Sequence, residues 1–282
     1  MKSILKYTVL FGLFLTLFTA CSSSDDAPKT NELSGLTKFK EITNDTHIIE
    51  LYAAKGSLAQ GYNEVSLRIK NKQTGAYEKN ATVTWQPLMH MAMMSHSCPF
   101  SAIQKTTTDG TLYKGYMVFQ MAQNDTEYWD LKVDYTLDGV NYSSTSVIDV
   151  PASEYKNTTT FTGTDGAKYI MAYIAPQTPK VAVNDFKVGL WKMQSMMSFT
   201  TVDGYQINID PRMPSMGNHG SPNNVNATQT KAGDFYTGKL SLTMTGYWKI
   251  NMQLLNTAGE VLKGEAITET QTDSSLYFDL EF

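Results

Sequence analysis

Apolar and polar residues alternate over short segments of the chain, which is the period of a β-strand with one buried face. The alternating segments are 65–69, 81–85, 117–121, 129–135, 187–191, 205–209, 239–244 and 248–254. Gly-containing turn signals lie between them, at Asp109-Gly110, Asp138-Gly139, Asp203-Gly204 and Ala258-Gly259. No stretch keeps a helical period. The pattern predicts an all-β chain built from immunoglobulin-like antiparallel sandwiches, with a barrel as the structural alternative.

The second half of the chain repeats the order of landmarks in the first half. Residues 52–65 match residues 173–186 at an offset of 121, with a Tyr, an Asn and an acidic residue in register. The landmarks that follow pair as Pro87 with Pro211, Met89 with Met213, His96 with His219, Pro99 with Pro222, and Trp129 with Trp248. We therefore predict two tandem homologous domains, at 46–152 and 167–282, joined by a connector at 153–166.

The N-terminus has the features of an export signal. Lys2 and Lys6 precede an apolar run that is too short for a membrane-spanning helix. Leu17-Phe18-Thr19-Ala20-Cys21 resembles the lipobox of bacterial lipoproteins, which implies removal of residues 1–20 and a lipid anchor on Cys21. Plain secretory cleavage after Ala20 is the alternative.

The residues after Cys21 are small, polar and acidic, so we expect 21–45 to form the lipidated cysteine and a flexible tether. The Ser and Asp run also resembles the surface-export signal of Bacteroidetes lipoproteins. Together these features predict a cell-envelope protein that is lipid-anchored to the membrane, with the outer membrane favoured, on its periplasmic or surface face.

Charge and motifs exclude several classes of function. The formal net charge is −4 and Lys and Arg do not cluster, so the sequence gives no support for nucleic-acid binding. The sequence contains no phosphate-binding Gly-rich loop, no Gly-x-Ser-x-Gly motif and no His-Glu-x-x-His motif. We therefore expect a protein that is not an enzyme. With Cys21 lipidated, Cys98 has no partner for an intramolecular disulfide.

Thioether and imidazole side chains gather in two loops, 89–99 and 213–222, which hold three of the four histidines. A thioether is polarizable and unprotonated in water, and a neutral imidazole ligates, so this set suits copper(I). Calcium and magnesium prefer carboxylates, which both loops lack, and a structural zinc site usually takes four Cys or His ligands. The candidate ligands are Met213, Met216 and His219 in the second loop and Met89, Met93, Met94 and His96 in the first, with Cys98 as an extra candidate.

The alternative is that these methionines only pack. If 89–96 were extended, Met89, Met91 and Met93 would face the core, and His90, Met94 and His96 would face solvent. That argument favours Met94 and His96 as ligands, whereas the repeat alignment favours Met89. A lone buried thiol such as Cys98 is usually inert. Three further methionines, Met193, Met196 and Met197, are expected to pack in the core or at a sheet edge, and the alternative is that they extend a Met patch beside the second loop.

The second half resembles a known family. Its loop Pro211-Arg212-Met213-Pro214-Ser215-Met216-Gly217-Asn218-His219-Gly220 is followed by Gly-Asp-Phe-Tyr-Thr-Gly at 233–238 and Gly-Tyr-Trp at 246–248. Over about 180–260 this looks like the YtkA-like/FixH-like family of small envelope β-sandwiches, whose loop has a Met-Pro-x-Met-Gly-His-like pattern. Asn218 departs from that pattern by adding one residue before His219. The first half is a divergent copy.

The resemblance implies copper binding, and for some members of the family a role in assembling respiratory oxidases. It therefore implies a protein that delivers, buffers or confers tolerance to copper(I), with a copper donor or acceptor protein or an oxidase as partner. A surface adhesion or scaffold lipoprotein, with immunoglobulin-like domains and no metal, is the alternative.

Overall fold

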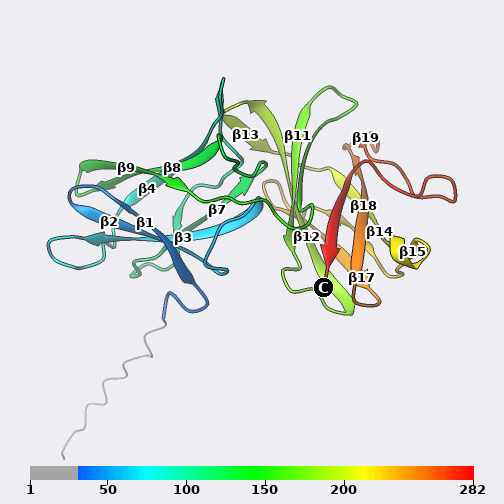
Figure 1. The fold of residues 1–282 in the computed structure, drawn as a ribbon, viewed down its shortest axis with the longest axis horizontal. Coiled ribbons are helices and arrows are strands. Elements are labelled where there is room, and N and C mark those ends of the chain that lie inside the picture. The colour runs from blue at the N-terminus through cyan, green and yellow to red at the C-terminus, as the bar shows by residue number, and fades with distance from the viewer. Residues whose placement is uncertain (1–30) are drawn as a thin grey trace, which may run out of the picture. The chain divides into compact units, whose positions relative to one another are not determined.

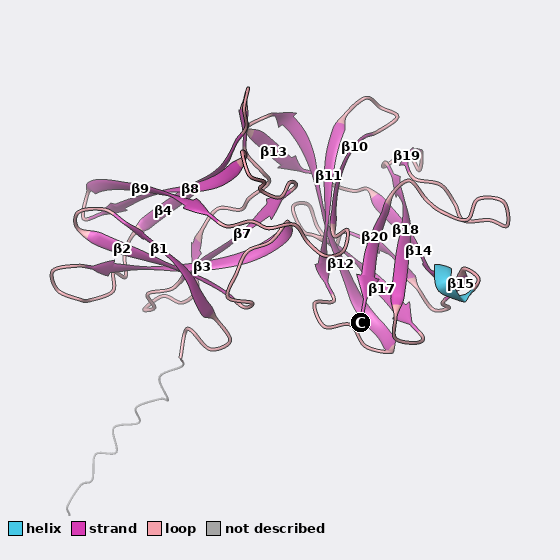
Figure 2. Ribbon diagram, viewed as in Figure 1, coloured by secondary structure: helices cyan, strands magenta, loops and turns pink. Residues whose placement is uncertain are grey.

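The structure is a computed structural model that describes residues 31–282. Within these residues the chain is almost entirely antiparallel β structure, and the only helix is the 3-10 turn η1 (Pro214–Met216) (Figures 1 and 2). None of the described helices has the length and apolar character needed to cross a membrane. The predicted signal at 1–20 and the predicted lipid attachment at Cys21 lie outside the described residues.

The N-terminal half of the described chain forms a sandwich of two sheets. One sheet has the order β1 (Thr37–Thr43), β2 (His47–Ala53), β3 (Gly61–Asn71), β7 (Tyr113–Phe119), β6 (Gln104–Lys105). The other has the order β5 (Ser95–His96), β4 (Thr82–His90), β8 (Tyr128–Leu137), β9 (Val140–Ile148). The turn predicted at Asp138-Gly139 joins β8 to β9 with both residues at positive φ, as a two-residue type I′ hairpin requires.

The C-terminal half forms a second sandwich, whose sheets are joined along one edge. Its main path is β10 (Thr158–Thr162), β11 (Lys168–Ala175), β12 (Ala182–Ser195), β17 (Tyr236–Leu242), β16 (Val225–Thr228), β14 (Gln206–Met213), β18 (Tyr247–Leu255), β19 (Val261–Lys263). Three more strands pair beside this path: β13 (Ser198–Thr201) with β12, β15 (His219–Gly220) with β14, and β20 (Tyr277–Glu281) with β18. Strand β16 pairs with both β14 and β17, which links the sheets.

The two sandwiches have the same strand order. One sheet runs β2-β3-β7-β6 in the first sandwich and β11-β12-β17-β16 in the second. The facing strands are β5-β4-β8-β9 and β15-β14-β18-β20. These orders correspond to A-B-E-D and C′-C-F-G of the immunoglobulin fold. The predicted fold class, tandem immunoglobulin-like β-sandwiches, is confirmed.

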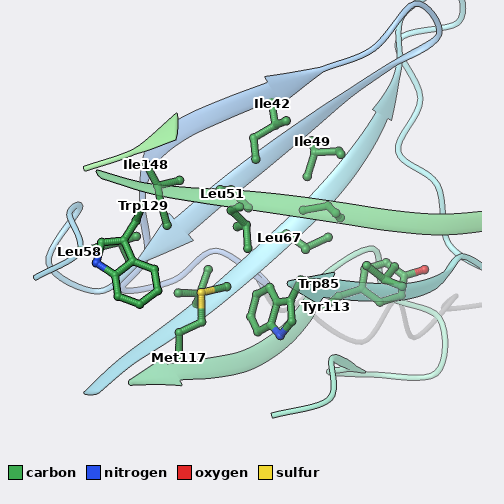
Figure 3. Close-up of a cluster of buried hydrophobic side chains, with 14 of the residues drawn as sticks. Ile42, Ile49, Leu51, Leu58, Leu67, Trp85, Tyr113, Met117, Trp129 and Ile148 are labelled. Carbon is green, nitrogen blue, oxygen red and sulfur yellow. The ribbon is translucent and has the colours of Figure 1, made fainter. Parts of the chain in front are cut away.

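Each sandwich has its own apolar core between its sheets. In the first, Ile42, Ile49, Leu51 and Leu67 from one sheet meet residues such as Trp129 from the other (Figure 3). In the second, the core is built in the same way around Trp248 and Phe278. Alternation along the strands places these side chains inward, since successive residues of a strand point to opposite faces. All four tryptophans are buried.

A third apolar cluster joins the two sandwiches. Val118 on β7 is buried together with Ile170 and Ala172 on β11 and Trp191 on β12. Aromatic residues from both sandwiches pack around them: Tyr62, Tyr116, Phe199 and Phe235. The residues from Leu33 to Phe282 accordingly form one compact unit.

Two strands lie where the sequence predicted irregular segments. Strand β1 falls within the predicted tether at 21–45, and β10 falls within the predicted connector at 153–166, so both predictions were wrong in these parts. Strand β1 is rich in Lys and Glu, and a β-bulge between Lys38 and Lys40 interrupts its alternation, which hides the strand. In β10 the sequence Thr-Thr-Thr-Phe-Thr is β-branched but mostly polar, so its period is weak.

Candidate metal centre

The first Met/His loop is a short hairpin. Strand β4 ends at His90, the chain turns at 91–94 with Met91 N donating to Met94 O at 2.9 Å, and β5 returns beside β4. The register pairs Met89 with His96. Directly opposed residues of antiparallel strands project to the same face, with Cβ atoms about 4.5–5.5 Å apart. A thioether and an imidazole are therefore neighbours at the end of the first sandwich.

The His96 side chain is buried and one of its ring nitrogens is unpartnered. The residue is 4% exposed, and its Nδ1 atom lies 2.8 Å from the backbone oxygen of Ser97. A carbonyl oxygen only accepts, so this contact requires a proton on Nδ1, whereas the Gln120 amide nitrogen, 3.1 Å from the same Nδ1, can donate to it only in the other tautomer. The shorter contact to Ser97, and the bond that Gln120 already makes to the Ser97 oxygen, favour the proton on Nδ1 and the lone pair on Nε2. Nε2 has no hydrogen-bond partner among the described residues. In proteins, an imidazole that ligates a metal through one nitrogen usually donates its other N–H to a carbonyl or carboxylate, which fixes the orientation of the ring.

Two further side chains bound this part of the site. The Trp129 ring meets the His96 ring edge to face at a centroid distance of 5.4 Å, and Trp129 also lies opposite Met89 in the pairing of β4 with β8. The Gln120 amide donates to the same Ser97 oxygen at 2.9 Å. The indole therefore covers one side of the Met89–His96 pair, and the amide helps to fix the carbonyl that orients the imidazole.

The predicted division of the first loop into a core face and a solvent face was wrong. It assumed an extended chain, but the turn at 91–94 reverses the strand, so His96 returns to the buried face beside Met89. Met93, which was placed toward the core, is 92% exposed at the tip. Met94 is exposed, as that argument expected.

Cys98 and His90 are engaged elsewhere. Cys98 is fully buried within the first core, and burial raises the pKa of its thiol well above the ordinary value, so the thiol is protonated at neutral pH. This favours packing over a ligand role for Cys98. The His90 Nε2 atom lies 2.7 Å from Asp130 Oδ2, and the ring stacks on Tyr128.

The second Met/His loop forms the equivalent hairpin. Its register pairs Met213 with His219, just as Met89 pairs with His96. Met216 lies in η1 and is 56% exposed. Gly217 and Asn218 follow at φ 66° and 60°, in the left-handed region that Gly and Asn tolerate best. These two residues turn the chain back, so the extra residue Asn218 is accommodated without breaking the Met–His pairing.

The two hairpins have equivalent rows of side chains, but their histidines differ in exposure. The register that pairs Arg212 with Lys249 places Met213 across from Trp248, so the order His, Met, Trp recurs over three strands. Met213 is buried like Met89, whereas His219 is exposed and His96 is buried. The first pair is therefore enclosed and the second is open to solvent.

The donor chemistry of both pairs is soft. Among the described residues no three His, Cys, Asp or Glu side chains gather as a metal site, so an ion held at either hairpin would need thioether ligands. Each hairpin offers a Met–His pair with additional thioethers at its tip: Met93 and Met94, or Met216. The free lone pair of His96 beside a thioether fits a soft monovalent ion such as copper(I) better than a hard cation.

Three residues near His96 were missed by sequence reasoning. Ser97 and Gln120 carry no motif, and their contacts depend on the pairing of distant strands. Met196 was expected to pack at an edge, but it is exposed at the tip of the β12–β13 hairpin, and its carbonyl accepts a hydrogen bond from Ser97 N at 2.9 Å. The sequence did contain one signal for this tip. Met196 and Met197 lie between two serines, at a turn position where methionine is unusual.

Comparisons with known proteins add little to this picture. No family model matches the sequence, and no curated protein matches it. Among solved structures, the chain is matched to the crystal structure of the conserved domain protein from Bacillus anthracis at 9% identity, over 87% of this chain and 86% of that chain, with a TM-score of 0.32. A TM-score of this size supports no inference about function.

Proposed function

We propose that the protein binds copper(I) through the Met–His pairs of its two hairpins and serves copper delivery, buffering or tolerance in the bacterial envelope. Copper is the cargo in this proposal, and the protein acts by coordination and transfer rather than by catalysis. The proposal includes the lipid anchor at Cys21, kinship with the YtkA-like/FixH-like family, and origin of the two sandwiches by duplication.

One observation carries the proposal: the buried imidazole of His96 lies opposite Met89 and its Nε2 atom has no partner among the described residues. A buried polar atom without a hydrogen bond costs about 1–3 kcal/mol, which a bound ion would offset. The recurrence of the same pairing at Met213 and His219 supports a role beyond packing, because only one of the two histidines is buried.

The test is a copper(I) titration against a colorimetric chelator. A chain of residues 22–282 keeps the whole compact unit. We expect this parent to bind two equivalents, and we expect the Met89→Leu/His96→Gln and Met213→Leu/His219→Gln variants each to lose one. Leucine preserves most of the buried volume of methionine, so the variants remove ligands with little repacking.

Met117→Leu is the matched control, since Met117 is buried in the first core and is outside the Met–His row. It should keep both equivalents. Circular dichroism of every variant checks that the sandwiches stay folded. Equal, weak uptake by the parent and all variants would contradict copper binding and favour a surface adhesion or scaffold protein.

A further inference from the structure

The exposed methionines are confined to three hairpin tips. Among the described residues, the strongly exposed ones are Met93, Met94, Met196, Met197 and Met216. Met93 and Met94 belong to the first Met/His loop, Met216 belongs to the second, and Met196 and Met197 form the tip between β12 and β13. The other described methionines are buried or partly buried. Exposed thioethers are therefore gathered where the candidate ligands are.

The β12–β13 tip contacts the first sandwich at the residue that follows His96. Ser97 N, in the first sandwich, donates to Met196 O, in the second, at 2.9 Å. Standard backbone dimensions then limit the Cα atoms of His96 and Met196 to a separation of at most about 8 Å. A methionine side chain can span much of such a distance. The backbone of the β12–β13 tip thus lies close to the backbone of His96, whose Nε2 atom has no partner among the described residues.

The residues at the β12–β13 tip are unusual for a turn. Ser195 pairs with Ser198, which leaves Met196 and Met197 as the two turn residues, and neither has a positive φ. Two-residue hairpin turns favour Asn and Gly, and methionine has no conformational advantage there. The two side chains are 40% and 46% exposed, so burial gives them only part of its usual benefit. Met193, in the same hairpin, instead packs in the apolar cluster between the sandwiches.

We propose that the first metal site is built from both sandwiches: the β12–β13 tip supplies the thioether of Met196 or Met197 to the ion held at Met89 and His96. This inference rests on the proposed function. Met93 and Met94, on the adjacent loop, extend the same soft surface toward solvent. Copper(I) keeps its oxidation state throughout, because each step only exchanges one neutral ligand for another.

The inference predicts an asymmetry between the two hairpins. Within residues 31–282 the first sandwich has no strand equivalent to β13, so no corresponding methionine tip lies beside Met213 and His219. The second site therefore keeps the open Met213, Met216 and His219 set alone. The first site should bind the first equivalent of a soft ion.

The test uses residues 22–282 carrying carbon-13 methionine methyl groups, titrated with silver(I) as a redox-inert analogue of copper(I). We expect the methyl signals of Met89 and of Met196 or Met197 to shift together with the first equivalent. We also expect Met196→Leu/Met197→Leu to weaken the first equivalent at least ten-fold and leave the second unchanged. Met193→Leu, in the same hairpin, should change neither.

The outcomes separate this inference from the proposed function. If Met89 responds while Met196 and Met197 do not, and their double variant binds normally, the composite site is refuted and copper binding stands. If no methionine responds to silver(I), both proposals fail. A ten-fold loss in the Met193→Leu control as well would also refute the composite site, because it would trace the effect to the packing of the hairpin.

Discussion

Buried polar side chains in the first sandwich differ in how well they are satisfied. His96 keeps one ring nitrogen without a partner among the described residues, which lowers the stability of the folded chain. Glu50 on β2 is the opposite case. It is nearly fully buried, yet Tyr52 OH donates to its carboxylate at 2.6 Å, Tyr77 OH donates at 2.9 Å, and Lys38 lies 3.5 Å away.

From the hydrogen bonds of Glu50 we predict that the free energy of unfolding depends on pH. Burial by itself would raise the pKa of Glu50, but the bonds from Tyr52 and Tyr77 and the charge of Lys38 outweigh it and lower the pKa. A lowered pKa in the folded state contributes stability above the unfolded pKa of about 4.3 and loses it as pH falls toward the folded value. We expect Glu50→Gln to cost about 1–3 kcal/mol at pH 7 and to flatten the decline below pH 5, measured by urea unfolding.

Glu41→Gln is the matched control, because Glu41 also pairs with Lys38, at 2.5 Å, but on the exposed surface. Exposed pairs contribute roughly 0–1 kcal/mol, so this variant should stay close to the parent at every pH. Parent and Glu50→Gln curves that remain parallel from pH 7 to pH 3 would refute the role given to the Glu50 carboxylate.

At the scale of elements, the alternation of apolar and polar residues located the strands that cover a core. It did not predict which loop side chains point inward, because that depends on where the chain turns. Strands β3, β8 and β18 follow their predicted segments. The first Met/His loop was assigned to the wrong faces, because a four-residue turn resets which side chains point inward. The repeat alignment favoured Met89 as a candidate ligand, whereas its pairing with His96 and the contacts with Gln120 and Met196 required the folded chain.

The turn of the second hairpin makes a specific demand on Asn218. At φ 60° an ordinary residue is strained by about 1–2 kcal/mol, which Asn largely avoids. Its Nδ2 atom also donates to Thr272 O at 3.1 Å. We expect Asn218→Ala to destabilise the protein by about 1–2 kcal/mol in urea unfolding, and we expect Asn218→Gly to cost less because glycine accepts the same φ.

Asn223 offers a matched comparison, since it has a φ of 66° in a neighbouring loop. Asn223→Ala should show the cost of the left-handed conformation without the bond to Thr272. If Asn218→Gly were as destabilising as Asn218→Ala, backbone conformation would not be the reason for Asn at this position.

For the whole molecule, the contact between the sandwiches is the feature that sequence reasoning did not anticipate. Trp191 is buried, and its cluster includes Val118 from the other sandwich. Asn157, between the sandwiches along the chain, donates to Gln60 O at 3.1 Å and adds a polar link. An apolar strand face in the sequence indicates that the face is buried, but it does not indicate which part of the protein buries it.

This interface predicts that the two sandwiches unfold together. Trp191→Ala removes the largest side chain of the cluster, at a cost of about 3–5 kcal/mol, so we expect the single calorimetric transition of the parent to split into two. Met252→Ala, within the second core alone, should lower the transition without splitting it. Two separate transitions already present in the parent would show that the cluster does not couple the sandwiches, and a Met196 tip that moves independently could not hold a shared ion.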